Sequence, residues 1–158
     1  MIKPITHMPK GYECPFCRVI SGLDVPNNGT KQEDVIFKND YVTAFIASKS
    51  WPNNKGHVLI VPNQHVENIY ELPKEYAGEI HQAAQIVAFA MKDTYRCDGI
   101  TTRQHNEPAG SQDVWHYHLH VYPRYKRDFF YLTRGLQTKP EKRAIYAEKL
   151  KKWIEAHL

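Results

Sequence analysis

Three histidines stand at alternate positions, 116, 118 and 120, in the segment "WHYHLHVYPRY" (115–125). Side chains two residues apart share one face of a β-strand, so these imidazoles are expected to point the same way. The residues between them are expected to face the opposite way, into a core: Tyr117, Leu119 and Val121. Single histidines in strands are usually packing or surface residues, but three in phase, with apolar residues in antiphase, indicate a functional site.

A histidine row of this kind can bind a metal ion or supply a nucleophile. His116 and His120 would lie ~13 Å apart along a flat strand, whereas zinc–nitrogen bonds are ~2 Å long, so one ion cannot be bound by all three. Two neighbouring histidines could share an ion, which leaves a mononuclear metallohydrolase as one alternative. A neutral imidazole, in contrast, has a lone pair near pH 7 that can attack phosphorus and form a covalent intermediate. Neighbouring histidines would then assist with the leaving group or the phosphate oxygens.

Turn residues and hydrophobic periodicity predict the elements that position this row. Strands are expected at 35–38, 41–47, 57–62, 99–106 and 114–124, the first two joined as a hairpin. Helical spacing predicts a short helical turn at 14–22, a long helix over 73–96 and an amphipathic helix over 140–158. The segment 48–56 is expected to be a loop. This order of elements predicts an α+β fold with a mainly antiparallel sheet.

Length and composition are those of one globular domain, with 158 residues of which 42% are hydrophobic and 12% aromatic. No apolar run approaches the ~20 residues of a membrane span, and the first twenty positions lack a signal-peptide pattern, so we expect a cytoplasmic protein. The net charge of +4 is uneven, because residues 124–152 carry ten Lys/Arg and three acidic residues. This basic segment is either a solvated face or an attractant for a phosphorylated ligand or a nucleic acid.

Four motifs, in this order along the chain, together resemble those of the histidine triad (HIT) family, whose pattern is His-φ-His-φ-His-φ-φ with φ apolar. They are "CPFC" (14–17), "GHVLIVPNQHVENIYEL" (56–72), "AGSQDVWH" (109–116) and "HYHLHVY" (116–122), the last followed by Pro-Arg. The resemblance implies a five-stranded, mainly antiparallel sheet with a long helix, and usually a homodimer. It covers residues 14–125, the expected HIT domain, with a basic linker and a C-terminal amphipathic helix (126–158) packed on the same domain.

The resemblance also implies hydrolysis or transfer of nucleotides at the α-phosphate, from dinucleoside polyphosphates or nucleoside phosphoramidates. By matching positions, His118 is the nucleophile that becomes nucleotidylated, and His120 and His57 orient it or contact the phosphate and the leaving group. The loop before the triad would supply the remaining catalytic group, Gln112, and phosphate-binding groups: Asn106, Ser111 and Asp113, together with His120. Either His105 or Asn106 matches the polar residue that the family has upstream of this loop.

The pair Cys14-x-x-Cys17 has three interpretations: a redox pair, two packed thiols, or half of a zinc site. The sequence has no second C-x-x-C, so two histidines must complete any tetrahedral site. In zinc-containing members of the family these resemble His65, in "PNQH", and the first triad histidine, His116. The resemblance therefore implies a structural zinc ion bound by Cys14, Cys17, His65 and His116, and leaves Cys97 as an inert thiol.

The chain departs from the family pattern where many members grip the ribose hydroxyls. "AFIASKS" places Ala47 where those members have an acidic or amide residue, with Ser48 as a possible substitute. Phosphate chemistry is therefore better supported than nucleotide recognition. The alternative function is a zinc-stabilised nucleotide- or nucleic-acid-binding module with little catalysis. For the enzyme, the expected partner is a small nucleotide substrate, and neither a membrane nor a nucleic acid is expected.

Overall fold

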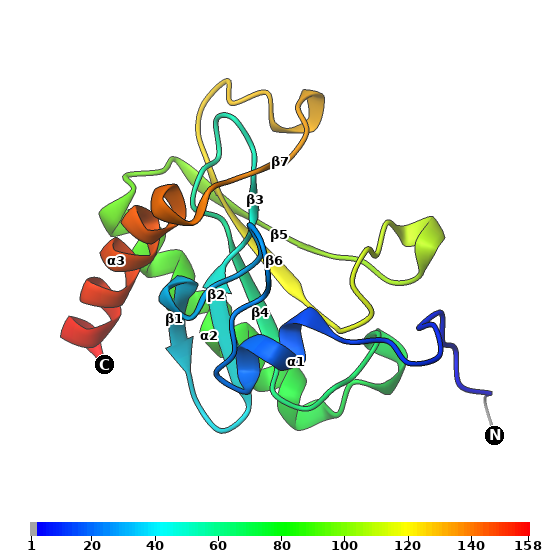
Figure 1. Ribbon diagram of the computed structural model, residues 1–158. Coiled ribbons are helices and arrows are strands. Elements are labelled where there is room, and N and C mark those ends of the chain that lie inside the picture. Colours follow the sequence, from blue (N-terminus) through cyan, green and yellow to red (C-terminus); the bar gives the residue numbers. More distant parts are fainter. Residues whose placement is uncertain (1–2) are drawn as a thin grey trace.

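The computed structural model describes residues 3–158, and within them five strands form one antiparallel sheet (Figure 1). In sheet order they are β1 (Val35–Lys38), β2 (Val42–Ile46), β4 (Val58–Pro62), β6 (Leu119–Arg124) and β5 (Gly99–Gln104). The β1–β2 hairpin turns at Asn39, whose side-chain oxygen accepts from the backbone N–H groups of Tyr41 and Val42. This side-chain turn explains why the Asn-Asp pair predicted the hairpin.

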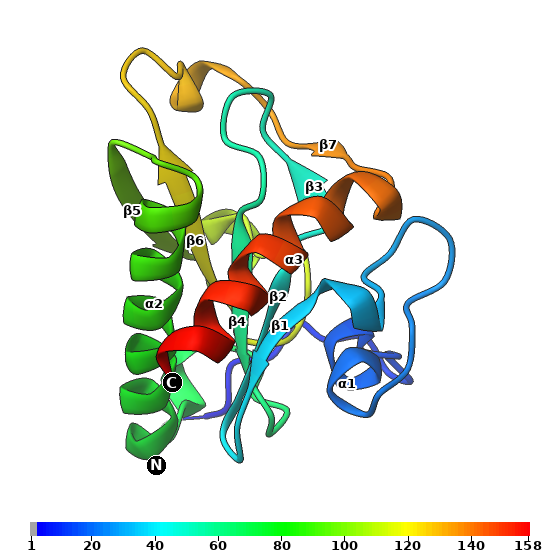
Figure 2. The same ribbon diagram turned by 90° about the vertical axis from the view of Figure 1, so that its left-hand side faces the viewer.

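Helices cover both faces of this sheet. The long helix α2 (Lys74–Thr94) and α3 (Pro140–His157) lie across one face, whereas the short α1 (Pro15–Ile20) packs on the other (Figure 2). α2 buries a stripe at helical spacing that includes Ile80, Val87 and Met91. The alternate residues of the triad segment pack against that stripe, as predicted: Tyr117, Leu119 and Val121. In the region the structure describes, no helix is both long and apolar enough to cross a membrane.

The structure confirms the α+β fold with its long helix and C-terminal helix, but the start of the last strand was predicted wrongly. β6 begins at Leu119, not at residue 114, because the chain bends through residues 114–118 before it joins the sheet. There the N–H of His116 donates to the carbonyl of Val114 at 2.8 Å, and the N–H of Tyr117 donates to that of Val66 at 2.6 Å. His116 and His118 therefore precede the strand.

The segments 48–56 and 126–139, expected as a loop and a linker, contribute to a second, small sheet. β3 (Lys49–Ser50) pairs with β7 (Leu136–Gln137), and the hydroxyls of Ser50 and Thr138 are hydrogen-bonded at 2.6 Å. A strand of two residues carries no periodicity, so the sequence pattern could not reveal it. The pairing lays the chain after the triad beside the loop that follows β2.

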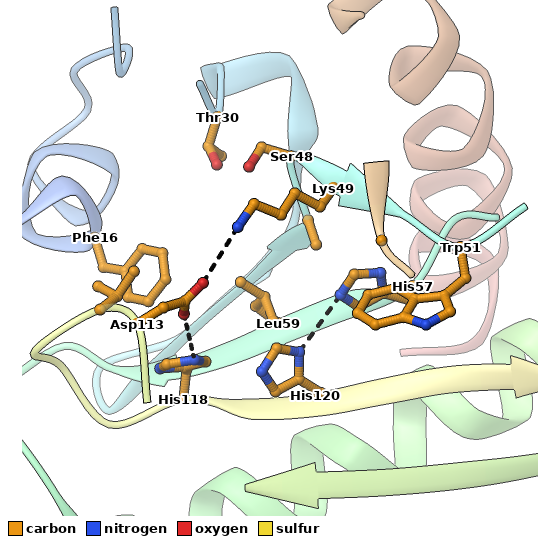
Figure 3. A pocket seen from close by; sticks show the side chains of 13 residues that line it. Phe16, Thr30, Ser48, Lys49, Trp51, His57, Leu59, Asp113, His118 and His120 are labelled. Atoms are coloured by element: carbon orange, nitrogen blue, oxygen red, sulfur yellow. Dashed lines mark hydrogen bonds and ion pairs between the residues drawn. The ribbon is translucent and has the colours of Figure 1, made fainter. Parts of the chain in front are cut away.

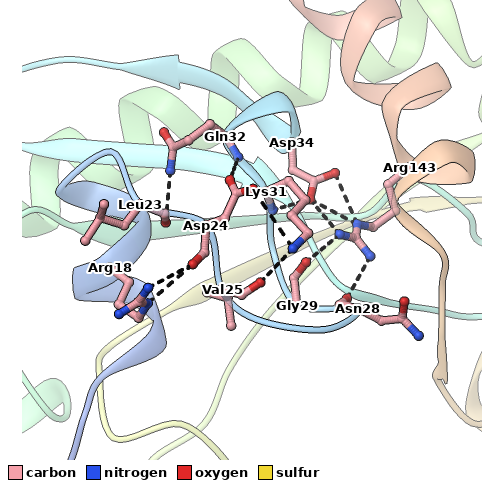
Figure 4. Close-up of polar contacts among 10 residues, drawn as sticks. All are labelled: Arg18, Leu23, Asp24, Val25, Asn28, Gly29, Lys31, Gln32, Asp34 and Arg143. Carbon is pink, nitrogen blue, oxygen red and sulfur yellow. Dashed lines mark hydrogen bonds and ion pairs between the residues drawn. The ribbon is translucent and has the colours of Figure 1, made fainter.

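A buried ion pair joins α3 to the loop before β1. Arg143 and Asp34 are each 1% exposed, and the guanidinium donates to the carboxylate at 2.8 to 3.1 Å. The same guanidinium donates to the carbonyl groups of Asn28 and Gly29 (Figure 4) and to that of Thr138. Since a buried guanidinium is tolerated only with its donors satisfied, this arrangement fixes both the 28–34 loop and the end of β7.

Candidate active site and metal site

Three histidines meet in a pocket of about 310 Å³ on the face of the sheet opposite α2 and α3 (Figure 3). His57 directly precedes β4, His120 lies in β6 and His118 lies in the bend before β6. One end of the pocket is apolar and is lined by Phe16, Leu59, Val114 and Ala47. Trp51 lies at the other end, with its ring edge-on to that of His57 at 5.5 Å between centroids (Figure 3).

The protonation of His118 follows from its hydrogen bond. Its Nδ1 lies 2.7 Å from the backbone carbonyl of His116, which can only accept, so Nδ1 carries the proton and Nε2 keeps a lone pair. Burial lowers the pKa of this imidazole below its ordinary value, so the ring is neutral at pH 7. Nε2 lies 4.0 Å from a carboxylate oxygen of Asp113, which lines the pocket (Figure 3). His118 thus presents an unprotonated nitrogen to the pocket.

His57 and His120 form a second pair, with 3.5 Å between His57 Nε2 and His120 Nδ1. The hydroxyl of Tyr122 lies 3.1 Å from the same Nδ1. Burial, above all, holds the pKa of His120 well below its usual range, and lowers that of His57 to about 3, with the charge of Arg103 adding to both shifts. If Tyr122 donates to Nδ1, neutral His120 carries its proton on Nε2, where it can serve as a hydrogen-bond donor.

Acidic conditions test the burial of His57. Its pKa is about 3 in the folded chain and 6.5 when unperturbed, so below pH 6.5 the unfolded chain binds a proton that the folded chain does not. Stability from this group is present above that pH and is lost as the pH falls toward 3, by ~2 kcal/mol near pH 5. Between pH 7 and pH 5, the free energy of unfolding measured with urea should therefore fall more for the wild type than for His57→Asn. Equal losses in the two proteins would contradict the burial of a neutral imidazole.

The loop before the triad brings one of its four predicted residues into the pocket. Asp113 faces His118 and lies 3.3 Å from Lys49 Nζ (Figure 3). Gln112 is buried elsewhere: its amide donates to the carbonyls of Glu67 and Val114, and its oxygen accepts from the N–H of Glu107.

The other two predicted loop residues also lie outside the pocket lining. The Asn106 oxygen accepts from the N–H of Ile69, and Ser111 is exposed in a left-handed conformation with φ 69°. The side chains of Asn106 and Gln112 are hydrogen-bonded to backbone groups of the loops. They therefore stabilise the loop that carries Asp113 and do not line the pocket. His105 likewise bonds the carbonyl of Gly110 at 2.7 Å.

Four predicted metal ligands come together beside this pocket. The ligand atoms of Cys14, Cys17, His65 and His116 all lie within 4.8 Å of one another. Nδ1 of His116 is 3.3 Å from Cys14 Sγ, and Nδ1 of His65 is 3.2 Å from Cys17 Sγ. Nε2 of His116 donates to the carbonyl of Pro62 at 2.9 Å, which leaves its Nδ1 lone pair facing the sulfurs.

The chemistry of this donor set fits a zinc ion. Without a cation, burial and the neighbouring Cys14 raise the pKa of the Cys17 thiol to about 12, so holding both sulfurs as thiolates requires positive charge. Two thiolates and two imidazoles are a common structural zinc set. Phe16, between the two cysteines, packs edge-on against His118 with 5.3 Å between ring centroids. The metal site therefore borders the apolar end of the pocket.

Three residues in or beside the pocket were not singled out from the sequence. Lys49 reaches Asp113 only because segments distant in the chain pack together, whereas Tyr122 contacts His120 from two residues further along the same strand. Arg103 lies opposite His120 in the β5–β6 ladder. Residues directly opposite in an antiparallel pair share a face, so the register of these strands is the signal that locates Arg103. That register was not predicted.

Known proteins with similar sequences and structures share this arrangement of elements. A profile of the HIT domain matches residues 28–127. "Protein hit" of Bacillus subtilis (strain 168) is 34% identical over 132 residues, covering 81% of this chain and 85% of the relative. The bis(5'-adenosyl)-triphosphatase of Dictyostelium discoideum is 30% identical over 99 residues, 63% of this chain and 65% of that protein. A solved structure of a zinc-bound histidine triad family protein from Mycobacterium smegmatis has the same fold, with a TM-score of 0.73 at 24% identity over 90% of this chain and 94% of its own.

Proposed function

The chain belongs to the HIT (histidine triad) family, and from this we propose that it hydrolyses or transfers nucleotides at the α-phosphate through a covalent bond to His118. The observation that carries the proposal is the 2.7 Å hydrogen bond from His118 Nδ1 to the His116 carbonyl. It leaves an unprotonated Nε2 in a pocket large enough for a small molecule. A relative named as a bis(5'-adenosyl)-triphosphatase supports a nucleotide as the substrate.

The proposed reaction has two displacements at the same phosphorus. His118 Nε2 forms a bond to the α-phosphorus, and the bond to the leaving group breaks with its electron pair on the leaving atom. A water molecule or another acceptor then attacks the phosphorus, the N–P electron pair returns to Nε2, and the acceptor gives up a proton. With Tyr122 donating to its Nδ1, His120 can donate a hydrogen bond from Nε2 to a non-bridging phosphate oxygen, which stabilises the charge that builds up there.

The lining of the pocket suggests how the nucleotide lies. Phe16, Leu59 and Val114 offer an apolar surface to a base at one end. Lys49, paired with Asp113, supplies a cation near His118. A phosphate above His118 would then lie between this lysine and the His57–His120 pair, with the base against Phe16. The expected homodimer remains a prediction.

We propose a structural role for zinc at Cys14, Cys17, His65 and His116. The ion, when bound, cross-links α1, the loop after β4 and the bend before β6, and it takes no part in the displacement. His116 holds the carbonyl that orients His118, so the same residue connects the cross-link to the nucleophile. A metallohydrolase keeps an open coordination position for water or substrate, whereas here four protein ligands converge.

A panel of nucleotides tests the proposed function. The purified protein is incubated with diadenosine triphosphate, adenosine 5'-phosphoramidate and a non-nucleotide phosphodiester, and the products are separated and identified. The proposal predicts release of a nucleoside monophosphate from at least one of the first two. Binding of these nucleotides with no product over hours would favour the binding-module alternative.

Substrate choice at the sugar follows from Ala47, which is 4% exposed and lines the pocket. A methyl group accepts no hydrogen bond from a ribose hydroxyl, so no buried partner is left unpaired when that hydroxyl is missing. We expect kcat/KM for a ribonucleotide to exceed that for its 2′-deoxy counterpart by less than about tenfold. Ala47→Ser, a small change in a buried place, should raise that ratio. A ribose preference on the order of a hundredfold in the wild type would show that another group, such as Ser48, holds the sugar.

A further inference from the structure

A second pocket, of about 580 Å³, opens on the far side of Trp51 from the catalytic one. The two pockets share Trp51 and Gly135. A Cβ at Gly135 would lie 2.8 Å from the Trp51 ring, so glycine is what allows the chain after the triad to pack directly on this ring. Trp51 and Gly135 therefore lie at the border that the catalytic pocket shares with a neighbouring space.

Arg103 points into this neighbouring space from the edge strand β5. It lies directly opposite His120, on the same face of the sheet. Its guanidinium carbon lies 5.7 Å from the ring centroid of Tyr122 and 5.3 Å from that of Phe130. The aromatic faces hold the guanidinium beside the catalytic histidines without neutralising its charge.

The contrast with Arg124 shows that Arg103 is unusual. Arg124 also lies over the Phe130 ring, but it is ion-paired with Asp128 at 2.6 Å and donates to Thr101. Arg103 is only partly exposed, and within residues 3–158 its guanidinium has neither a hydrogen bond nor an ion pair. A half-buried cation with all its donors free indicates a place for an anion.

The rest of the second pocket has the same electrostatic character. Arg134 lines it and, in the part of the chain that the structure describes, also has no ion pair. Neutral polar side chains also line it, among them Thr101, Thr102, Tyr131 and Thr133. Among the described residues, no carboxylate lines the pocket. The space next to His120 is therefore positively charged, and among the described residues no negatively charged group lines it.

We propose that Arg103 and Arg134 form a subsite that binds an anionic leaving group, a phosphate or polyphosphate chain, during the transfer to His118. The inference rests on the proposed function, since it concerns the group expelled in that reaction. As the bond from Nε2 to phosphorus forms, the P–O bond breaks and its electron pair stays on the leaving oxygen, which gains one negative charge. A guanidinium can stabilise that charge through two parallel hydrogen bonds, and no proton has to be supplied.

This subsite makes the enzyme selective between two classes of substrate. A polyphosphate leaving group departs as an anion and is stabilised by Arg103. An amine expelled from a phosphoramidate departs as a neutral molecule once it has taken up a proton, so a guanidinium offers it nothing in the transition state. Arg103 is therefore a specificity-determining residue for the leaving group, and not for the nucleotide that is transferred.

Two substrates that transfer the same adenylyl group test the inference: diadenosine triphosphate and adenosine 5'-phosphoramidate. Arg103→Met keeps the aliphatic stem on the aromatic rings but removes the charge. We expect kcat/KM to fall on the order of 30-fold for the triphosphate and less than about threefold for the phosphoramidate. Arg103→Lys should recover part of the loss. Arg96→Met is the matched control, because Arg96 is exposed at the end of α2 and should change neither rate.

Equal losses on the two substrates, or no loss on either, would overturn the inference while leaving the proposed function intact. If the wild type cleaves neither substrate, the proposed function fails, and a binding experiment then decides on the subsite alone. In that experiment, inorganic tripolyphosphate is titrated while tryptophan fluorescence is recorded, since Trp51 borders the subsite. Arg103→Met should weaken binding about tenfold or more, and Arg96→Met should not. Binding that is unchanged by Arg103→Met would refute the subsite.

Discussion

Replacing His118 with asparagine is expected to lower nucleotide turnover by on the order of a thousandfold or more, because the residue that forms the covalent bond is removed. The reason lies in the geometry of one side chain. His118 is 2% exposed, and its Nδ1–H is held by the carbonyl of His116. The asparagine amide can donate to the same carbonyl, so the buried hydrogen bond is kept while Nε2 is lost. Asparagine therefore separates loss of the nucleophile from loss of the fold.

Steady-state rates on the best substrate of the wild type measure this effect, and thermal unfolding with elemental analysis for zinc checks that the variant is folded and loaded. His57→Asn is the matched comparison. His57 is equally buried, but its side chain contacts His120 and does not form the bond to phosphorus. It should lower the rate by a smaller factor, on the order of ten to a hundred. A purified His118→Asn that turns over at a near-normal rate would show that the nucleophile is assigned to the wrong residue.

Loss of a zinc ligand is expected to have the second-largest effect, on stability. Cys14→Ala should release the ion and lower the free energy of unfolding by at least ~3 kcal/mol, or Tm by roughly 10 °C, because binding of structural zinc contributes directly to folding. The four ligands come from segments far apart in the chain, Cys14 and Cys17 beside α1, His65 after β4 and His116 before β6. Without the ion these segments lose their cross-link.

Differential scanning calorimetry and metal analysis test this directly, with Cys97→Ala as the control. Cys97 is a buried thiol outside the cluster, so its replacement should retain one zinc per chain and most of the stability. A chelator should lower the activity no faster than it removes the ion, because the activity is lost only when the packing of Phe16 on His118 is disturbed. Carefully prepared wild-type protein that contains no zinc, and whose Cys14 and Cys17 are both freely alkylated, would be incompatible with this site.

The sequence predicted the parts of the site that depend on local spacing. Alternation placed Leu119 and Val121 in the core and His120 on the opposite face, and the C-x-x-C pair with two histidines forms one cluster. Alternation could not show that the strand begins only at Leu119. Before that residue the contacts of His116 are not those of a sheet strand: its ring contacts the Cys14 sulfur, and its carbonyl accepts a hydrogen bond from the His118 side chain.

The parts that depend on tertiary pairing were not visible in the sequence. Gln112 was predicted to be catalytic, but its side-chain amide is hydrogen-bonded to three backbone groups of the surrounding loops. Arg103 becomes part of the site only because the register of β5 sets it opposite His120. Arg143 looks like one more basic residue of the C-terminal segment, yet its burial against Asp34 shapes the loop beside the pocket. Register and burial of long polar side chains are set by contacts between distant segments, which local patterns do not encode.

If His118 Nε2 becomes bonded to phosphorus during turnover, the mass of the quenched protein should reveal the bond. Enzyme in excess over substrate is mixed for a fraction of one turnover and stopped in alkaline denaturant, because a phosphorus–nitrogen bond is hydrolysed in acid. Intact mass and peptide mass are then measured. We expect a mass increase of one nucleotidyl group, located on the peptide that contains His118, and no increase for His118→Asn. An adduct on a different residue, or single-turnover cleavage with no adduct at any quench time, would contradict it.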